Sequence, residues 1–137
     1  MADQSELDAQ ILNDVADALI YSDRSGTITR WNRASTALFG FSADEALGQN
    51  LDLIVPEHLR AAHWKGFEAA IASGTMKLAG RPTLTRALHK SGRKLYIEMT
   101  FALVRDAGGA VQGSVAMARD VTERVERDRA ARAAQNS

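Results

Sequence analysis

The 137-residue chain contains no cysteine, and this absence removes several classes of chemistry. Without a thiol it can form no disulfide, thiolate zinc site, iron–sulfur cluster or catalytic cysteine. Long hydrophobic runs are also missing, since no uninterrupted apolar stretch exceeds four residues. A membrane-spanning helix needs about 20 such residues and a signal-peptide core about 7–15. The sequence therefore predicts a cytoplasmic protein that does not insert into a membrane.

Neither sign of charge predominates, because 17 Lys and Arg residues balance 17 Asp and Glu residues. Surfaces that bind nucleic acid through its phosphates are rich in positive charge, so we expect no nucleic-acid partner. Common catalytic motifs are absent as well: there is no Gly-X-Ser-X-Gly elbow, His-Glu-X-X-His pair or phosphate-binding glycine loop. At about 100–200 residues per domain, the length predicts one domain, and we expect it not to be an enzyme.

Hydrophobic spacing and turn residues predict a helix, two strands, several short helices, three strands and a last helix. A strand at 95–103 has the clearest period-two pattern, and Pro56 precedes the longest central helix, at 57–72. Ser42 and Glu45 form a capping box for a short helix. Strands divided by a helical block predict an α+β domain whose antiparallel sheet is covered on one face. Such a sheet can retain a cavity for a small ligand.

Several motifs follow one another in a familiar order. They are Asp23-Arg24-Ser25-Gly26-Thr27-Ile28, Trp31-Asn32, Phe39-Gly40-Phe41-Ser42, Leu47-Gly48, Val55-Pro56-Glu57, Lys90-Ser91-Gly92-Arg93 and Arg119-Asp120-Val121-Thr122-Glu123. Over about residues 13–124 they resemble a PAS sensor domain of the S-box type. The resemblance implies a five-stranded antiparallel sheet in a sensor domain at 13–122. Residues 1–12 are then an amphipathic flanking helix, and residues 123–137 begin a C-terminal signalling helix.

The light-sensing branch of that family attaches flavin through a cysteine in a Gly-X-Asn-Cys-Arg-Phe-Leu stretch. The matching segment here is Gly48-Gln49-Asn50-Leu51-Asp52-Leu53-Ile54. Leu51 stands at the cysteine position, and a thioether cannot form without a thiol. A flavin adduct is therefore excluded, while flavin bound without an adduct stays open.

A second branch of the family binds haem. The run Pro56-Glu57-His58-Leu59-Arg60-Ala61-Ala62-His63 resembles the Pro-Glu-X-X-Arg-X-X-His run in haem-binding PAS domains of bacterial oxygen-sensing histidine kinases. The resemblance implies that His63 is the metal ligand of a haem b. It also implies that Arg81 hydrogen-bonds to bound oxygen or a propionate. Ala69 stands near the position of a further arginine of the family, and Lys77 is the candidate to replace that arginine as a propionate partner.

Helical geometry gives a reading of His63 that does not depend on the resemblance. At 100° per residue, an arc of about 100° contains Leu59, His63, Gly66, Phe67 and Ala70. His63 is the one polar side chain on this inward stripe, whereas His58 points about 140° away from it. A lone histidine on an apolar face is also common in ordinary cores, so both interpretations stay open. His89, in a predicted hairpin, is expected to be exposed.

Apolar residues of two late strands are the predicted pocket walls beside Phe67. They are Met99, Phe101 and Leu103 on one strand and Val115 and Met117 on the next. The same residues would serve equally well as plain core.

Two functions remain. In the first, the domain binds haem and senses a diatomic gas or redox state. In the second, it is a cofactor-free PAS module for dimerisation and signal relay, with a cavity that is filled by side chains or holds a weak metabolite. In both, we expect a homodimer through the N-terminal and C-terminal helices and a downstream effector domain such as a kinase.

Overall fold

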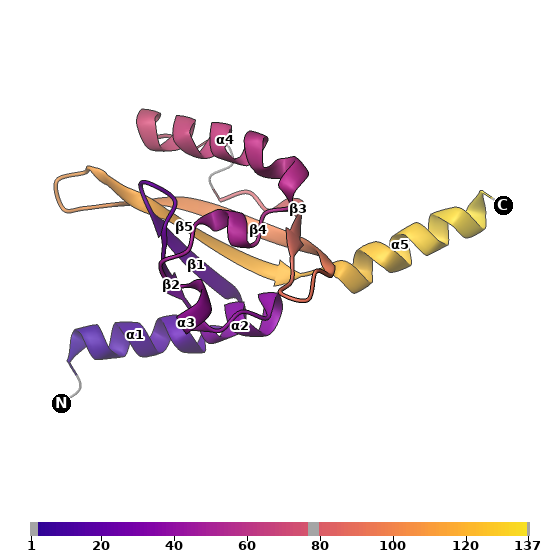
Figure 1. Ribbon diagram of the computed structural model, residues 1–137, viewed down its shortest axis with the longest axis horizontal. Coiled ribbons are helices and arrows are strands. Elements are labelled where there is room, and N and C mark those ends of the chain that lie inside the picture. Colours follow the sequence, from indigo (N-terminus) through magenta and orange to yellow (C-terminus); the bar gives the residue numbers. More distant parts are fainter. Residues whose placement is uncertain (1–2, 77–79, 137) are drawn as a thin grey trace.

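One antiparallel sheet organises the chain. The computed structural model describes residues 3–76 and 80–136. Its strands are β1 (Ala18–Asp23), β2 (Ile28–Trp31), β3 (Thr83–Leu88), β4 (Lys94–Arg105) and β5 (Val111–Asp120). They follow the order β2-β1-β5-β4-β3, so β1 pairs with β5 at the centre of the sheet (Figure 1). The predicted α+β class and the five-stranded antiparallel sheet are confirmed.

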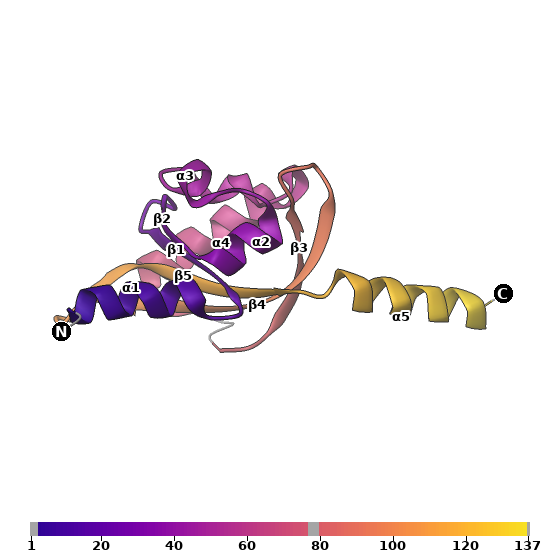
Figure 2. The ribbon, with the colours of Figure 1, turned by 90° about the horizontal axis from the view of Figure 1, so that it is seen from below.

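The helices are divided between one face of the sheet and the two ends of the chain. They are α1 (Gln4–Asp14), α2 (Arg33–Phe39), α3 (Ala43–Ala46), α4 (Arg60–Ser73) and α5 (Thr122–Gln135), with 3₁₀ turns η1 (Leu51–Leu53) and η2 (Glu57–Leu59). Figure 2 shows α2, α3 and α4 on the same side of β4 and β5, while α5 extends away from the sheet. The predicted helical block therefore covers one face, which we call the inner face.

Side-chain caps explain the chain's path through the first half. Asn32 is buried, and its Oδ1 accepts hydrogen bonds from the backbone N–H groups of Leu19 and Ser35 at 2.9 and 3.0 Å. One side chain thus begins α2 and fastens it to β1. The predicted capping box of Ser42 and Glu45 is present at the start of α3. These satisfied backbone donors hold the short helices in place.

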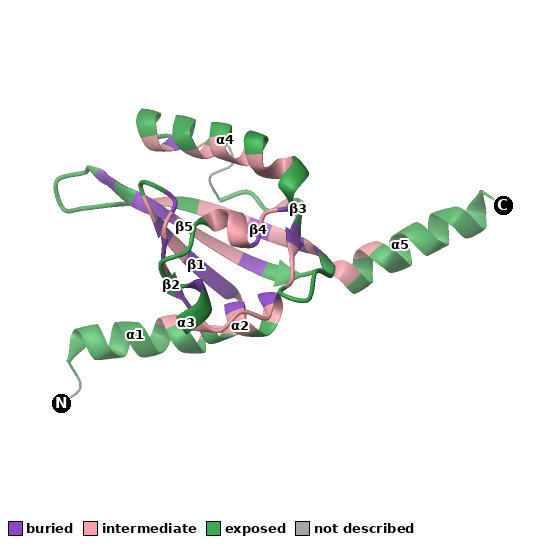
Figure 3. Cartoon of the chain, viewed as in Figure 1, coloured by how far each residue is buried: buried purple, intermediate pink, exposed green. Residues whose placement is uncertain are grey.

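The hydrophobic core lies between the inner face and the α2–η1 segment. Its largest fully buried apolar side chains are Phe39, Ile20, Ile28, Leu95 and Ile97. In Figure 3 the buried residues concentrate on the sheet and the base of α2, whereas α1 and α5 are mostly exposed. Burying one such side chain stabilises the fold by about 1.5–3 kcal/mol, so this cluster is the main source of stability.

Two helix boundaries differ from the expectation. The central helix, predicted as one element, is a 3₁₀ turn followed by α4, and Arg60 at the junction donates to the carbonyl oxygens of Val55 and Asp52 at 3.0 and 3.2 Å. The sequence places Asp120 two residues before Thr122, as an N-cap aspartate of the exit helix would be, and its Oδ1 accepts from the N–H of Thr122 at 2.9 Å. Val121, however, occupies the N-cap position itself.

Candidate functional site

The position of α4 defines the candidate site. Near its start, the Trp64 indole lies so close to Gly26 in the β1–β2 turn that a Cβ there would stand 2.2 Å from the ring. At its end, the Arg105 guanidinium donates to the carbonyl oxygen of Gly74. Between these anchors, no α4 residue belongs to the hydrophobic core cluster of the described chain, and Ala70 alone is buried. The helix is thus held at both ends without being packed into the core.

His63 lies on the inward side of α4 and is half-buried. Its ring stacks on Phe67, with centroids 6.1 Å apart, and meets the edge of Trp64 at 4.8 Å. Nδ1 is enclosed and has no hydrogen-bond partner. Burial lowers the pKa of His63, and the Asp52 carboxylate opposes this in part. The imidazole is therefore neutral near pH 7, which is the state that binds a metal.

Asp52 and Trp64 are the site residues that the sequence did not reveal. The Trp64 Nε1–H donates to Asp52 Oδ1 at 2.8 Å, and Arg60 Nε lies 3.9 Å from the same oxygen. This arrangement connects η1 to α4 directly beside His63. Gly66, by contrast, is exposed, so its predicted place on the inward stripe is wrong, and Trp64 lies there in its stead.

The strand register divides the five predicted wall residues between two faces. Met99 pairs with Ala118, Phe101 with Ala116 and Leu103 with Ser114, so these positions share the inner face. Met117 pairs with Thr100 and Val115 with Ala102, which places both on the outer face. The prediction that all five form one cavity is therefore wrong for Val115 and Met117. In β4 and β5 the odd positions of one strand oppose even positions of the other, and the hairpin fixes that register.

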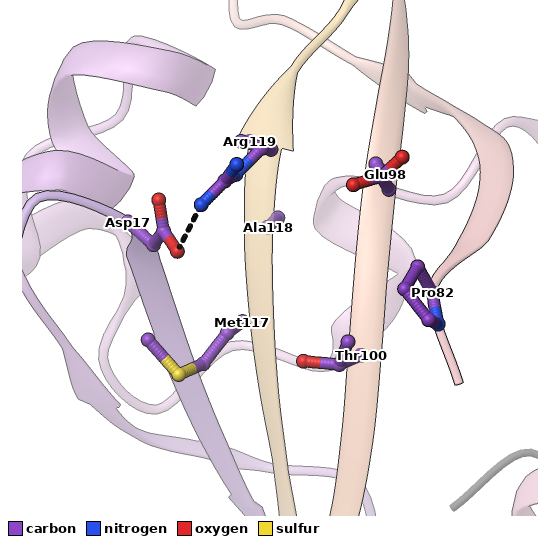
Figure 4. A pocket seen from close by; sticks show the side chains of 7 residues that line it. All are labelled: Asp17, Pro82, Glu98, Thr100, Met117, Ala118 and Arg119. Carbon is purple, nitrogen blue, oxygen red and sulfur yellow. Dashed lines mark hydrogen bonds and ion pairs between the residues drawn. The ribbon is translucent and has the colours of Figure 1, made fainter. Parts of the chain in front are cut away.

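Met117 instead lines a shallow pocket of about 260 Å³ on the outer face (Figure 4). Around it stand Asp17, Pro82, Glu98, Thr100, Met117, Ala118 and Arg119. Arg119 Nη2 pairs with Asp17 Oδ2 at 3.2 Å across its mouth. A second pocket, of about 190 Å³, lies beside α1 at Leu12 and Leu19. His63 lines neither of them.

Of the remaining predicted groups, two are exposed, one is partly buried and one is not described. Arg81 is exposed, and Lys77 falls outside the described residues. His58 is exposed, in agreement with its predicted orientation. His89 is not freely exposed as expected: its ring lies against Gly40, where an added Cβ would stand 2.6 Å from Cε1.

The described residues contain no cluster of three or more His, Asp or Glu side chains able to hold a metal ion. A single histidine in aromatic surroundings instead suits a cofactor such as haem, in which the macrocycle supplies most of the ligands of the iron and the protein supplies one. His63 fits that requirement as a single half-buried imidazole beside the rings of Trp64 and Phe67. The predicted wall residues Met99, Phe101 and Leu103 lie on the inner face, the side of the sheet on which α4 lies (Figure 2).

A family model described as the PAS fold matches residues 6–121 of the chain. The match covers the whole five-stranded sheet and ends at the start of the exit helix. The chain is a PAS domain. The predicted family is thereby confirmed, and the chain is a sensory domain of signal transduction. None of the described helices combines the length and apolar character needed to cross a bilayer.

Relatives of this PAS domain are much longer proteins. An uncharacterized protein of Azorhizobium caulinodans is 31% identical over 121 residues, which cover 88% of this chain and 16% of that protein. Sensor protein FixL of Bradyrhizobium diazoefficiens is 42% identical over 53 residues, which cover 39% of this chain and 10% of its own length. The chain thus spans less than a fifth of either relative.

Solved structures resemble it across most of its length. The PAS domain of a Colwellia psychrerythraea protein superposes with a TM-score of 0.75 at 24% identity, covering 88% of this chain and 99% of its own. An RNA-binding Light-Oxygen-Voltage receptor superposes with a TM-score of 0.71 at 27% identity, covering 91% of this chain and 35% of its own. The first likeness concerns the fold alone.

Proposed function

We propose that this PAS domain binds haem b through His63 and senses a diatomic gas or a redox state. The observation that carries the proposal is the neutral, inward-facing imidazole of His63 on a helix that the core does not hold. The Pro56–His63 run, which resembles that of haem-binding PAS domains, supports it. So does the similarity to a protein named as a sensor.

In this proposal each residue of the site has a defined role in binding the cofactor or its ligand. Nε2 of His63 binds the iron, and Phe67 packs beside the imidazole. Inner-face residues Met99, Phe101 and Leu103 provide the apolar wall, while Arg81 is the partner of a propionate or a bound gas. When bound, haem supplies an iron centre that exchanges small ligands and changes oxidation state.

A route from the pocket to α5 runs along β4. The N–H of Val121 donates to the carbonyl oxygen of Tyr96 at 2.9 Å, and the N–H of Tyr96 donates to Thr122 Oγ1 at the same distance. Arg124 lies 3.5 Å from Glu98. Because Tyr96 and Glu98 alternate with the wall residues of the same strand, a shift of β4 moves the start of α5. We propose that this movement controls an effector domain such as a kinase.

Homodimer formation through α1 and α5 belongs to the same proposal. Leu7 and Ile11 lie one turn apart on α1 and are 47% and 52% exposed. Such an apolar stripe on an otherwise polar helix suits a contact with a second helix. It also favours the second candidate function, a cofactor-free dimerisation and relay module, because this surface needs no cofactor.

A haemin titration followed by Soret absorption tests the haem proposal. We expect the native chain to bind one equivalent, His63→Ala to lose most of the binding and His58→Ala, the exposed control, to retain it. Equal losses from both variants would refute the assignment of the ligand. A native chain that takes up no haemin would leave the cofactor-free module as the function.

Light scattering tests the dimer. Leu7→Asp combined with Ile11→Asp should shift the chain toward monomer, while the charge-matched control Ser5→Asp with Ala9→Asp should not. An unchanged mass for the first pair would refute dimerisation through α1.

A further inference from the structure

Helix α4 begins without a side-chain cap. Neither its N-cap residue, Leu59, nor Pro56, the N-cap residue of the preceding turn η2, caps the helix with a side-chain hydrogen bond. The N-cap residues of α2 and α3, Asn32 and Ser42, both do so. The first N–H groups of a helix have no partner within it, and α4 also lies outside the core cluster. Other contacts must therefore fix the position of its start.

Asp52, in the 3₁₀ turn η1, makes such contacts with two residues of α4. Its Oδ1 accepts a hydrogen bond from the Trp64 Nε1–H at 2.8 Å and lies 3.9 Å from Arg60 Nε. Its backbone carbonyl oxygen accepts a second bond, from Arg60 Nη2 at 3.2 Å. Arg60 and Trp64 are four residues apart and so lie on one face of the helix. Asp52 thus fixes both where α4 begins and how the helix is turned about its axis.

Asp52 is itself held by the segment that it joins to α4. Asn50 Oδ1 accepts a hydrogen bond from the N–H of Asp52 at 2.7 Å, and the N–H of Leu51 donates to the carbonyl oxygen of Gly26 at 3.1 Å. The Trp64 ring lies against the same Gly26. Asp52 therefore holds Trp64 against a turn to which η1 is bonded directly.

The orientation of His63 depends on these contacts because it is the helix neighbour of Trp64. Its ring meets the edge of the Trp64 ring, with centroids 4.8 Å apart, and its Nδ1 has no hydrogen-bond partner. Consecutive residues of an α-helix are separated by a fixed rotation of about 100°. A turn of α4 that moves Trp64 away from Gly26 consequently turns His63 by the same angle.

We propose that Asp52 is a positioning residue for His63: through its hydrogen bond to Trp64 it sets the rotation of α4 at which the imidazole faces inward. This deepens the proposed function and rests on it, since there His63 is the ligand of the haem iron. In this role Asp52 acts through Trp64 and does not itself bind the iron. An aspartate with a structural role alone would affect stability and leave the geometry of the imidazole unchanged in the folded molecules.

The first part of the test uses the protein without haem. Asp52→Ala and Trp64→Phe each remove the hydrogen bond, and each should increase amide exchange in the first turns of α4 about five- to tenfold, with β4 and β5 unchanged. Asp52→Asn retains an oxygen acceptor and should restore most of the protection. Asp8→Ala, the control, removes an exposed carboxylate from α1 and should have no effect. Native exchange in α4 of Asp52→Ala would overturn the proposal.

A double-mutant cycle tests whether Asp52 acts through Trp64. If the two side chains act through one hydrogen bond, Asp52→Ala combined with Trp64→Phe should increase the exchange of α4 no more than the stronger single variant does. Increases that multiply in the double variant would show that the two residues act independently, and would overturn the proposal.

The second part follows the imidazole in the haem-loaded protein. Asp52→Ala and Trp64→Phe should weaken haemin uptake and shift the iron–histidine stretch of the ferrous protein in resonance Raman spectra, whereas Asp52→Asn should stay close to native in both measurements. A stretch that is unshifted in both of the first two variants, whatever their amide exchange, would overturn the proposal, because Asp52 would then be a structural anchor alone.

The failure of this proposal and that of the haem function can be distinguished. If the native chain takes up no haemin, the haem function is wrong, and the NMR signals of the Gly26 α-protons, which lie against the Trp64 ring, decide the role of Asp52 instead. They should move in Asp52→Ala and stay in place in Asp52→Asn, and unmoved signals in Asp52→Ala would overturn the proposal. If haemin binds through His63 and the Asp52 variants keep the native stretch, only the positioning proposal is wrong.

Discussion

Helices α2 and α4 lie on the same face of one sheet, yet the molecule holds them in opposite ways. Phe39 of α2 is fully buried, and its ring lies 5.5 Å from Trp31. The polar groups of α2, at Asn32 and Ser35, are all hydrogen-bonded. On α4, His63 keeps an unpaired nitrogen. One helix is therefore packed into the core, while the other lies outside the core cluster and keeps a buried polar atom unpaired.

The largest expected effect contrasts two phenylalanines. Phe39→Ala should lower the free energy of unfolding by about 3–5 kcal/mol, because it empties a filled core position. Phe67→Ala, on half-buried α4, should lower it by only about 1 kcal/mol. Urea denaturation of both variants measures the difference. Equal losses would show that α4 is packed as firmly as α2, and the contrast between the two helices would be lost.

Much of the packed region can be read from the sequence because its signals are local. A glycine turn, an asparagine cap and a serine–glutamate capping box each specify the backbone within a few residues. Those at Gly26, Ser42 and Glu45 place β1, β2 and α3 as expected. The family and the sheet are confirmed for the same reason.

The site was harder to predict because its geometry depends on distant segments. Val115 and Met117 have the hydrophobic character of wall residues, but the pairing of β4 with β5 turns them to the outer face. Helical spacing alone did not indicate that Trp64 would reach Asp52 and Gly26, since those contacts join three separate elements. Alternation within one strand indicates which of its own residues share a face. It does not indicate which residues of the neighbouring strand lie on that same face, because this depends on the register between the strands.

Two glycines provide the second contrast. Gly26→Ala should destabilise the fold by about 2–3 kcal/mol, because Gly26 has φ +86° and its Cβ would overlap Trp64. Gly66→Ala should stabilise it by about 0.5–1 kcal/mol, since Gly66 lies in a helix and its Cβ would meet open space. Thermal unfolding measures both. If Gly26→Ala is harmless, Trp64 is not an anchor of α4.

The third contrast concerns pH and is confined to the α4 side. Burial lowers the pKa of His63, so between that value and the usual histidine pKa of about 6.5 the unfolded chain binds more protons than the folded one. The contribution of His63 to the stability of the fold should therefore be fully present above about pH 6.5 and be lost as the pH decreases below that value. His63→Gln should reduce this slope.

Denaturation curves between pH 5 and pH 8 provide the measurement. His58→Gln is the matched control and should keep the slope, because His58 is exposed. Hydrogen bonds, chiefly from the Ser25 hydroxyl, lower the pKa of Asp23. Its contribution is therefore lost only in more acidic solution, below the usual aspartate pKa of about 3.9. A slope that survives His63→Gln would mean that another group titrates in this window.

The smallest expected effect concerns α5 and tests whether this helix, like α4, is held by few contacts. The Arg129 guanidinium lies 4.8 Å from the centroid of the Tyr96 ring, a cation–π contact worth about 0.5–1 kcal/mol at an exposed site. Arg129→Ala should therefore increase amide exchange in the first turns of α5 by about two- to fivefold and leave the core strands unchanged. Arg127→Ala removes a similar charge from the same helix and should have little effect. Equal exchange in the two variants would mean that the Tyr96 ring does not hold α5, so that a signal would reach the exit helix through Val121, Thr122 and Arg124.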